Sequence, residues 1–216
     1  MPSDRYARLV LSRLSKRYGY NIHTQLRHQN MTHLFVAVLL SPQSTDAQTN
    51  KTTEKLFRRF KTFRDYANAD PKMLRRCLSG MNYYKTKARH LRESARIIAG
   101  RFHGRVPKTL SELIELPGVG RKVANVVLNE GYGIDEGIAV DTHAGRVARR
   151  LGFSRSKDPY KVEMSLLRIY PRKDWGRVSN TFIELGRDTC KARNKECYRC
   201  ALKDICPSSD VKPNKN

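Results

Sequence analysis

A glycine turn between two helical segments constrains the fold of this chain more than any other feature. In TLSELIELPGVGRKVANVVLN, Thr109 is followed three residues later by Glu112, which is the pattern of a helix-opening capping box. Pro117 ends that helix, the Gly-Val-Gly sequence at 118–120 supplies a tight turn, and the helical pattern resumes over 121–129. Two helices joined by so short a turn form a helix–hairpin–helix.

Helical patterns also dominate the rest of the chain, and alternating strand patterns are rare. The segment MTHLFVAVLLS is almost continuously apolar and indicates a central helix, although its length also fits a buried strand. AVDTHAGRVARRLG and KVEMSLLRIYP are helical, and the chain has no internal repeat or long linker. These patterns predict an all-α protein. In KARHLRESARIIAGRF the apolar residues form one stripe of an amphipathic helix: Ala88, Leu91, Ala95, Ile98 and Phe102.

The charge balance favours a polyanionic partner. Lys and Arg number 43 against 20 Asp and Glu in 216 residues, a formal net charge of +23 that is spread over most of the chain. A folded protein with this excess repels itself unless a polyanion neutralises it, and nucleic acid is the expected partner. A basic protein that binds no nucleic acid is the alternative. Hydrophobic residues make up 39%, enough for the core of one large domain or two small ones.

The N-terminal sequence MPSDRYARLVLSRLSKRYGY lacks the unbroken apolar stretch of a signal peptide. No segment approaches the roughly 20 apolar residues that span a bilayer. We therefore expect a soluble, intracellular protein of the cytoplasm or nucleoid. The five cysteines are then poor candidates for structural disulfides.

The turn of the hairpin has the composition of a phosphate site. A glycine turn that leads into a helix leaves backbone N–H groups pointing outward at the positive end of the helix dipole. A Cβ at a glycine would hold a DNA backbone away. An ordinary turn between helices is the alternative. The residues that would supply the N–H groups are Gly118, Val119, Gly120 and Arg121.

Lys122 occupies the mouth of the second helix, where the helix dipole disfavours a cation. A solvated lysine that steers phosphate is one interpretation. In the other, partial burial and the helix N-terminus lower the pKa of the amine, and the neutral amine acts as a nucleophile towards carbon. The spacing of the residues does not decide between the two.

Three motifs together resemble endonuclease III of the helix–hairpin–helix/GPD superfamily of DNA glycosylases: LPGVGRKVANVVLN, IAVDTHAGRVARR and AVLLSPQSTDAQTNK. The resemblance extends from about residue 5 to Cys206. It implies that Lys122 attacks C1′ of a damaged nucleoside, releases the base, and forms a Schiff base whose β-elimination nicks the strand 3′ to the abasic site. Family members without this lysine are monofunctional. The segment EGYGIDEG is about one residue longer than the usual family pattern, a difference that a loop absorbs.

Asp141, in VDTHAGRVARR, directly precedes a helical pattern, so an N-cap that satisfies backbone donors is its simplest role. The resemblance places the essential carboxylate of the family at this residue. There it would accept a proton from the amine of Lys122 or stabilise positive charge as the base departs. The two roles are compatible. His143 either contacts a DNA phosphate or fills the helix surface.

Base excision requires the base to leave the stack, and a side chain must fill the gap. The resemblance assigns this role to Gln43, in the S-P-Q-S-T-D loop at 41–46. A second wedge residue comes from the loop GMNYYKTKA, which differs from the usual family sequence. Met81, Asn82 and Tyr83 are the candidates, and the sequence does not choose among them.

Four cysteines near the end of the chain, Cys190, Cys197, Cys200 and Cys206, follow the spacing C-x6-C-x2-C-x5-C. Four thiolates this close indicate metal in an intracellular protein, and sulfur ligands suit zinc or an iron–sulfur cluster. The resemblance implies a [4Fe–4S] cluster. We expect its role to be structural rather than redox, because a short loop-rich segment has too little apolar material to fold alone. Cys77 is expected to be a buried apolar residue.

The loop KARNKE, between the first two of these cysteines, carries Lys191, Arg193 and Lys195. A basic loop tethered between metal ligands suits phosphate contact, and we expect these residues to bind DNA. A solvated surface loop is the alternative.

The resemblance implies two helical lobes. Residues 24–134 would form a six-helix barrel domain that contains the hairpin, and residues 1–23 plus 135–207 the iron–sulfur cluster domain. Residues 208–216 would form a disordered tail. DNA would lie in the cleft between the lobes, with Lys122 and Asp141 facing each other across it.

By resemblance, the substrate is double-stranded DNA with an oxidised or ring-saturated pyrimidine, such as thymine glycol, or an abasic site, and the protein acts as a monomer. Two other functions stay open. One is a thymine–guanine mismatch glycosylase on the same fold, in which Lys122 is incidental. The other is a non-catalytic DNA-binding metal module.

Overall fold

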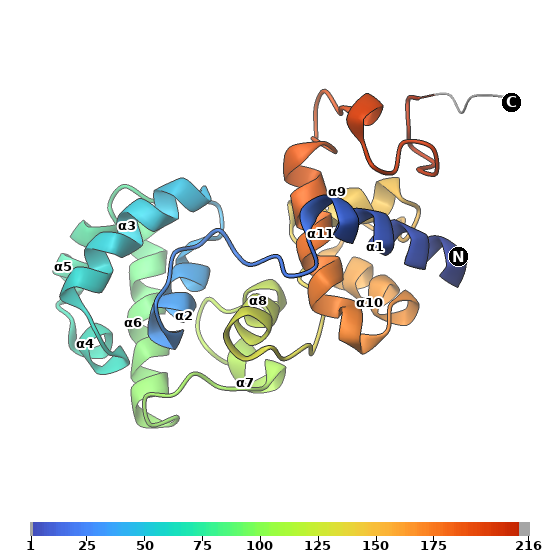
Figure 1. The fold of residues 1–216 in the computed structure, drawn as a ribbon. Coiled ribbons are helices and arrows are strands. Elements are labelled where there is room, and N and C mark those ends of the chain that lie inside the picture. Colours follow the sequence, from blue (N-terminus) through green and yellow to red (C-terminus); the bar gives the residue numbers. More distant parts are fainter. Residues whose placement is uncertain (1, 212–216) are drawn as a thin grey trace, which may run out of the picture. The chain divides into compact units, whose positions relative to one another are not determined.

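The computed structural model describes residues 2–211, and this range contains helices, turns and loops but no β-strand (Figure 1). The predicted all-α class is therefore confirmed. Two 3-10 helices, η1 (Arg172–Asp174) and η2 (Cys197–Arg199), accompany the α-helices. The α-helices of the described range are α1 (Asp4–Tyr18), α2 (Met31–Leu40), α3 (Asp46–Arg59), α4 (Phe63–Asn68), α5 (Pro71–Leu78), α6 (Tyr84–Gly100), α7 (Leu110–Ile114), α8 (Arg121–Tyr132), α9 (Thr142–Arg150), α10 (Pro159–Ile169) and α11 (Trp175–Asp188).

The described residues form two compact units, each with its own hydrophobic core. The hairpin unit is the contiguous segment Thr24–Ile134 and holds α2 to α8. The cysteine unit combines the described residues up to His23 with those from Asp135 onward, so it holds α1 and α9 to α11. The chain thus leaves the cysteine unit once and returns to it once.

The central helix of the hairpin unit is α2. Its residues from His33 to Leu40 are all buried, and α3, α6 and α8 pack against it. A helix that is apolar on every side is a buried core element, which explains why its sequence also fitted a buried strand. The contact with α8 is close at Gly131, where a Cβ would lie 2.4 Å from the Met31 sulfur. The described part of this unit holds the helical segments α2 to α8, of which α4 and α7 are the shortest.

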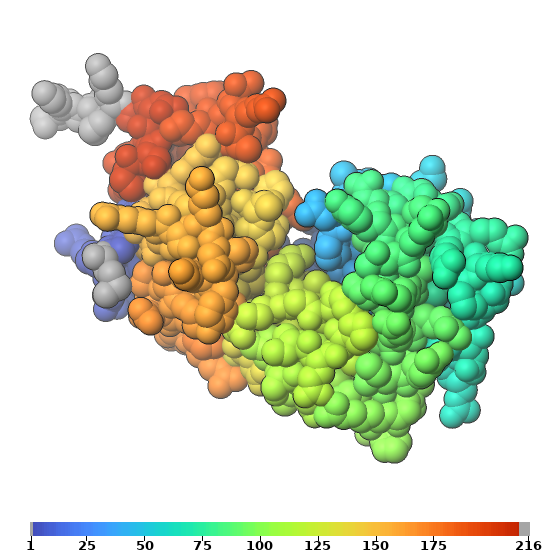
Figure 2. All heavy atoms as spheres, turned by 180° about the vertical axis from the view of Figure 1, so that it is seen from behind, coloured from blue at the N-terminus to red at the C-terminus, as the bar shows by residue number. Residues whose placement is uncertain are grey.

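The predicted apolar stripe lies on α6. Ala88, Leu91, Ala95 and Ile98 are buried, whereas Phe102 follows the end of the helix and is only partly buried. Because α4 and α5 pack against this helix, the stripe closes one side of the core. The opposite side of α6, with Lys85, Thr86, Arg89 and Arg96, is exposed to solvent, and the helix is visible as a green column in Figure 2.

In the cysteine unit, α1 and α9 both pack against α11. Aromatic side chains fill the core: the ring centroid of Phe153 lies 5.6 Å from that of Tyr170 and 5.9 Å from that of Phe182. The Tyr18 hydroxyl donates to Asp188 Oδ2 at 3.0 Å, which joins the end of α1 to the end of α11. The first helix of the chain is therefore built into the same core as the last.

The predicted disordered tail, residues 208–216, falls only partly in the described range, because 212–216 lie outside it. Lys195 holds the start of this segment: its Nζ lies 2.6 Å from the Ser208 carbonyl oxygen and 2.7 Å from Asp210 Oδ1. Among residues 2–211, no helix combines the length and apolar character that crossing a membrane requires.

Candidate active site

The two glycines of the hairpin turn differ in backbone conformation and in the space that a side chain would have. Gly118 has φ +82°, in the left-handed region that other residues rarely adopt, and a Cβ there would lie 2.7 Å from His90 Nδ1. Gly120 has an ordinary φ of −90°, and a Cβ there would meet no atom within 4 Å. The fold therefore requires Gly118, whereas Gly120 leaves open space at the start of α8 that a partner can enter.

Gly118→Ala and Gly120→Ser should separate these roles. Gly118→Ala should lower the free energy of unfolding by about 1–3 kcal/mol, because it adds left-handed strain. Gly120→Ser should keep or raise stability, since serine is a good N-cap, but it should weaken duplex binding by filling the open space. Thermal unfolding and fluorescence anisotropy on a labelled duplex measure the two effects. Wild-type affinity of the Gly120→Ser protein would contradict the assignment.

No side chain caps the N-terminus of α8, because its N-cap is Gly120. The first turn of such a helix favours an anion through its backbone N–H groups. Lys122 is the second residue of α8 and is half-buried, followed by the buried Val123 and Ala124. The partial burial that the nucleophile interpretation needs is therefore observed.

Asp141 is the N-cap of α9, as its place before a helical pattern predicted. Its Oδ1 accepts hydrogen bonds from the backbone N–H groups of His143 and Ala144, both at 2.8 Å. No hydrogen bond from the described residues reaches Oδ2. One oxygen of this half-buried carboxylate thus caps the helix, and the other stays available for a second partner.

His143 lies where α9 passes α11. A Cβ at Gly186 would come within 2.7 Å of His143 Cβ, so the two helices are in close contact there. Arg146 Nη2 donates to the Gly186 carbonyl oxygen at 2.7 Å and lies 3.3 Å from His143 Nδ1. Arg146 Nε donates to the Cys190 carbonyl oxygen at 2.9 Å. The helix that Asp141 caps is therefore joined to α11 and to the start of the cysteine segment.

The three candidates for the second wedge differ in exposure. Met81 is only 3% exposed and belongs to the core. The Asn82 side chain donates through Nδ2 to the Gln43 carbonyl oxygen at 2.9 Å. Tyr83 is 71% exposed and has φ +55°. Gln43 is also exposed, with φ +59°, so two exposed side chains in left-handed backbone belong to loops that contact each other.

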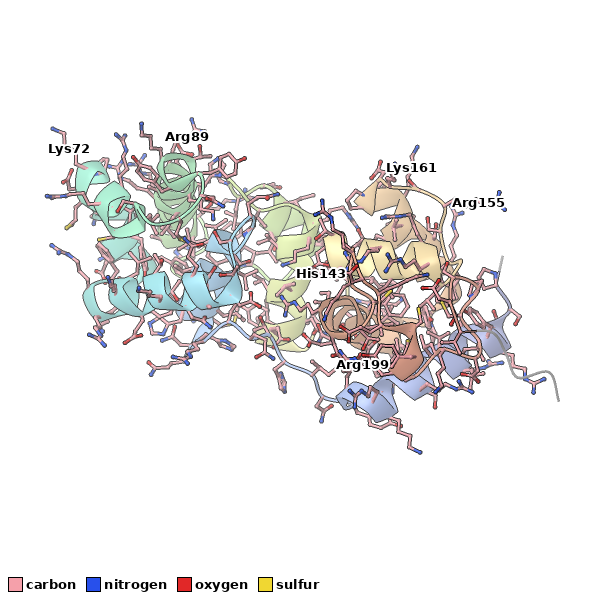
Figure 3. The ribbon with its side chains drawn as sticks, turned by 90° about the horizontal axis from the view of Figure 1, so that it is seen from above. Lys72, Arg89, His143, Arg155, Lys161 and Arg199 are labelled. Carbon is pink, nitrogen blue, oxygen red and sulfur yellow. The ribbon has the colours of Figure 1, made fainter. Side chains whose placement is uncertain are left out.

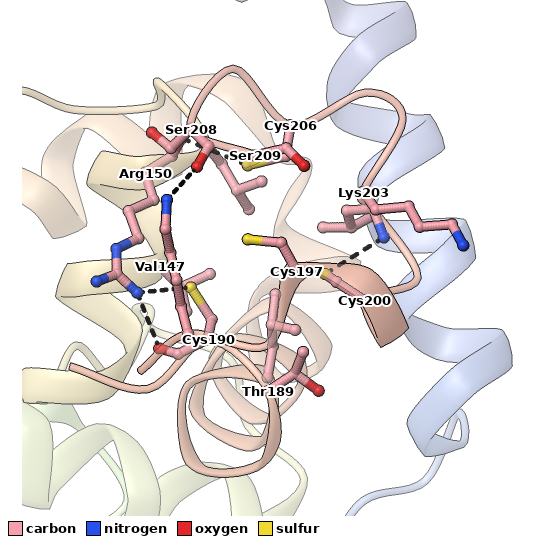
Figure 4. Close-up of a pocket in the computed structure, with 14 residues that line it drawn as sticks. Val147, Arg150, Thr189, Cys190, Cys197, Cys200, Lys203, Cys206, Ser208 and Ser209 are labelled. Carbon is pink, nitrogen blue, oxygen red and sulfur yellow. Dashed lines mark hydrogen bonds between the residues drawn. The ribbon is translucent and has the colours of Figure 1, made fainter. Parts of the chain in front are cut away.

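The four cysteines line one pocket in the cysteine unit (Figure 4). All are free thiols. Arg150 Nη1 donates to Cys190 Sγ at 3.2 Å, and the backbone N–H of Leu202 donates to Cys200 Sγ at 3.4 Å. The pocket therefore collects sulfur atoms together with donors that would stabilise negative charge on them.

The chemistry of this pocket fits a metal centre with thiolate ligands. Burial raises the pKa of the Cys200 and Cys206 thiols, and the neighbouring cysteines raise it further, so thiolates here need accompanying positive charge. In the part of the chain that the structure describes, no three His, Cys, Asp or Glu side chains lie close enough to hold one metal ion. Four thiol side chains around one pocket are a donor set that suits zinc or an iron–sulfur cluster.

The basic residues of the loop 191–195 differ in their partners. Lys191 pairs with Glu196, and Lys195 is committed to Ser208 and Asp210. Arg193 is exposed, and the structure records no partner for it among residues 2–211. Basic side chains lie on both units (Figure 3), including Lys72, Arg89, Arg155, Lys161 and Arg199.

Two polar residues of these sites, Lys87 and Arg150, were not predicted from the sequence. Lys87 is 7% exposed and its Nζ donates to Ser44 Oγ at 2.8 Å. The sequence does contain a signal for the burial of Lys87, because this residue lies four positions before Leu91 and so shares the buried face of α6. Arg150, the donor to the Cys190 sulfur, had no comparable signal, since only folding brings it to a residue 40 positions away.

Residues 36–172, more than half of the chain, match the family model of HhH-GPD superfamily base excision DNA repair proteins. The all-helical fold and the glycine hairpin agree with that class. Endonuclease III of Synechocystis sp. is 38% identical over 186 residues, which cover 86% of this chain and 85% of the relative. Endonuclease III of Bacillus subtilis is 38% identical over 192 residues, covering 88% and 87%.

A solved structure of a trapped endonuclease III–DNA covalent intermediate, an estranged-adenine complex, has the same fold. It is 37% identical, and the match covers 96% of this chain and 97% of the other with a TM-score of 0.90. The chain therefore belongs to the endonuclease III family.

Proposed function

We propose that this DNA glycosylase and abasic-site lyase releases oxidised or ring-saturated pyrimidines, such as thymine glycol, from duplex DNA in the cytoplasm or nucleoid, acting as a monomer. The activity class follows from membership of the endonuclease III family. One observation supports the reaction above all: Lys122 is half-buried in the first turn of α8, directly after the hairpin. A covalent endonuclease III–DNA intermediate in the matching structure agrees with a protein nucleophile.

In the proposed reaction, Lys122 Nζ bonds to C1′ as the glycosidic bond breaks, and the electron pair leaves with the base. The sugar ring then opens to a protonated Schiff base. Loss of a proton from C2′ expels the 3′ phosphate, and water releases the lysine. Asp141 would accept the proton that the amine loses, or stabilise positive charge on the sugar, through Oδ2 while Oδ1 caps α9.

The hairpin would bind a DNA phosphate through backbone N–H groups at the start of α8. In the loop 191–195, Arg193 is the best-placed phosphate ligand, because it has no partner among the described residues. His143, Lys191 and Lys195 would have to exchange the partners they already have. The hairpin residues in this proposal are Gly118, Val119, Gly120 and Arg121.

Gln43 and Tyr83 are the proposed wedges that fill the gap left by the extruded base. Both are exposed, whereas Met81 is buried and the Asn82 amide is already hydrogen-bonded. An aromatic side chain stacks on any base, since every base has a π face. Tyr83 should therefore tolerate different bases in the opposite strand.

Tyr83→Ala should lower kcat/KM for thymine glycol release from duplex DNA by about 5–150-fold, because stacking on one base contributes about 1–3 kcal/mol. Tyr83→Phe should keep wild-type rates, since it keeps the ring and loses only the hydroxyl. Single-turnover excision assays compare the two variants. A defect of equal size in both would assign the role to the hydroxyl rather than to stacking.

Cys190, Cys197, Cys200 and Cys206 are the proposed ligands of a [4Fe–4S] cluster. Bound there, the cluster would supply the positive charge that four thiolates need and would link four points of a segment whose only described helix is η2. The role of the cluster is structural, because it holds together the cysteine segment. Arg146 and Arg150 of α9 donate hydrogen bonds to Cys190 at the start of that segment.

Purified protein should be brown and contain iron and inorganic sulfide in equal amounts. Cys200→Ser should lower the iron content and reduce Tm by on the order of 10 °C, because a bound group stabilises only the folded state. Cys77→Ser is the matched control, since Cys77 lies in the hairpin unit and outside the pocket. Zinc in place of iron would overturn the cluster assignment.

The substrate is tested with a panel of duplexes that carry thymine glycol, a thymine–guanine mismatch, an abasic site or no lesion, each with and without borohydride. Release of thymine glycol together with a trapped adduct is the expected result. Base release from the mismatch alone, without an adduct, would instead indicate a mismatch glycosylase. Binding without any product would indicate a non-catalytic DNA-binding module.

A further inference from the structure

The loop before α3 and the loop before α6, residues 41–45 and 80–83, are tied to each other; we call them the paired loops. The first tie is the Asn82 side chain, which donates to the Gln43 carbonyl oxygen at 2.9 Å. Asn82 directly precedes the proposed wedge Tyr83, and Gln43 is itself the other proposed wedge. Because the acceptor is the main-chain carbonyl of Gln43, this hydrogen bond fixes the backbone of Gln43. The Gln43 side chain stays free to enter DNA.

The second tie joins the loop 41–45 to α6, the helix that follows the loop 80–83: Lys87, in its first turn, donates through Nζ to Ser44 Oγ at 2.8 Å. It is 7% exposed, and it makes no ion pair with a carboxylate of residues 2–211. Burial lowers the pKa of its amine. A buried amine with a single hydroxyl partner is a costly way to stabilise a core, which points to a role beyond stability. Gln48 adds a third tie by donating to the Gly80 carbonyl oxygen.

Both wedge residues have left-handed backbone, with φ +59° at Gln43 and +55° at Tyr83. Residues other than glycine keep this conformation only where their surroundings impose it, and such sites cluster where function requires it. The ties from Asn82 and Lys87 act on these two short loops. They are therefore in place to impose the conformation before DNA arrives.

We propose that Asn82 and Lys87 are positioning residues that hold the paired loops as one preformed element, so that Gln43 and Tyr83 enter the DNA stack together. The inference rests on the proposed wedge roles of those two residues. A preformed element does not have to order its loops during binding, and displacement of a positioned group by about 1 Å can cost on the order of 100-fold in rate.

The test uses Asn82→Leu, Lys87→Met and Ser44→Ala in the full chain. Each should lower kcat/KM on thymine glycol duplexes by about 10–100-fold. Each should also reduce the fluorescence increase of 2-aminopurine placed opposite the lesion, which reports opening of the stack. Borohydride trapping on single-stranded abasic DNA, which has no stack to open, should stay within about twofold of wild type.

Three comparisons make the result specific. Lys87→Met and Ser44→Ala should not add in the double variant, because they remove the same hydrogen bond. Lys87→Arg should restore part of the duplex activity, since it keeps a donor, and Lys72→Met controls for the loss of one positive charge. Lys87→Met should keep or raise Tm, because it removes a buried charge.

Wild-type duplex rates and 2-aminopurine signals in Asn82→Leu and Ser44→Ala would overturn the inference. So would equal losses on duplex and single-stranded DNA, because these would indicate a general structural role. Absence of a trapped adduct in the wild-type protein would instead refute the proposed function. Unchanged duplex rates in Gln43→Ala and Tyr83→Ala would refute the wedge roles on which the inference rests.

Discussion

Lys122→Gln should abolish the covalent adduct that borohydride traps on abasic DNA and lower lyase turnover by on the order of 1,000-fold or more. The reason is chemical, because an amide nitrogen does not form a Schiff base. Folding should survive the change. Lys122 is the second residue of α8, where the helix dipole disfavours a cation, so a neutral glutamine should keep stability or raise it by about 0.3–1 kcal/mol.

Arg121→Gln is the matched control, since it removes a positive charge one residue earlier on the same helix. It should weaken duplex affinity and its salt dependence, yet still give the adduct at saturating DNA. Mass spectrometry of the trapped complex identifies the modified residue. An undiminished adduct in Lys122→Gln would move the nucleophile elsewhere in the chain.

Asp141→Asn should lower base release from duplex DNA by about 100- to 10,000-fold at almost constant stability. Asn and Asp are equally good N-caps, so α9 keeps the two hydrogen bonds that Asp141 Oδ1 now accepts. Only the negative charge and its capacity to take up a proton are lost. Single-turnover excision, measured beside thermal unfolding, records both quantities.

Asp141→Ala completes the comparison. It removes the cap as well as the charge and should lower the free energy of unfolding by about 1 kcal/mol. If Asp141→Asn excised bases at the wild-type rate while Asp141→Ala did not, the residue would be a cap alone. The carboxylate of the reaction would then have to be sought elsewhere.

The sequence predicted the elements whose signals are local. The apolar recurrence from Ala88 to Ile98 gave α6, and the aspartate before THAGRVARR gave the N-cap of α9. Thr109 caps α7 as expected, because its side chain accepts a hydrogen bond from the Glu112 backbone N–H. The second bond of the predicted capping box differs: the Glu112 carboxylate accepts a hydrogen bond from the Thr109 hydroxyl, at 2.7 Å. Periodicity and capping are properties of neighbouring residues, so they can be seen before the chain folds.

Features that depend on tertiary contacts could not be predicted in this way. Sequence spacing left Met81, Asn82 and Tyr83 equivalent, and only burial of the first and the hydrogen bond of the second distinguish them. The sequence predicts the same DNA-binding role for Lys195 as for Lys191 and Arg193, and only the structure shows that Asp210 forms an ion pair with it. The buried amine of Lys87 depends on Ser44, which lies 43 residues away. Each of these properties is created by a neighbour that is distant along the chain.

The route of the chain through the two units also bears on how the protein is made. On the ribosome, residues 24–134 emerge as one uninterrupted block and can fold as soon as they leave the exit tunnel. The first helix emerges earlier but finds its partner, α11, only after residues 175–188 have also been synthesised. Until then its apolar face is exposed, so nascent chains that stall between these points should be the form most dependent on chaperones.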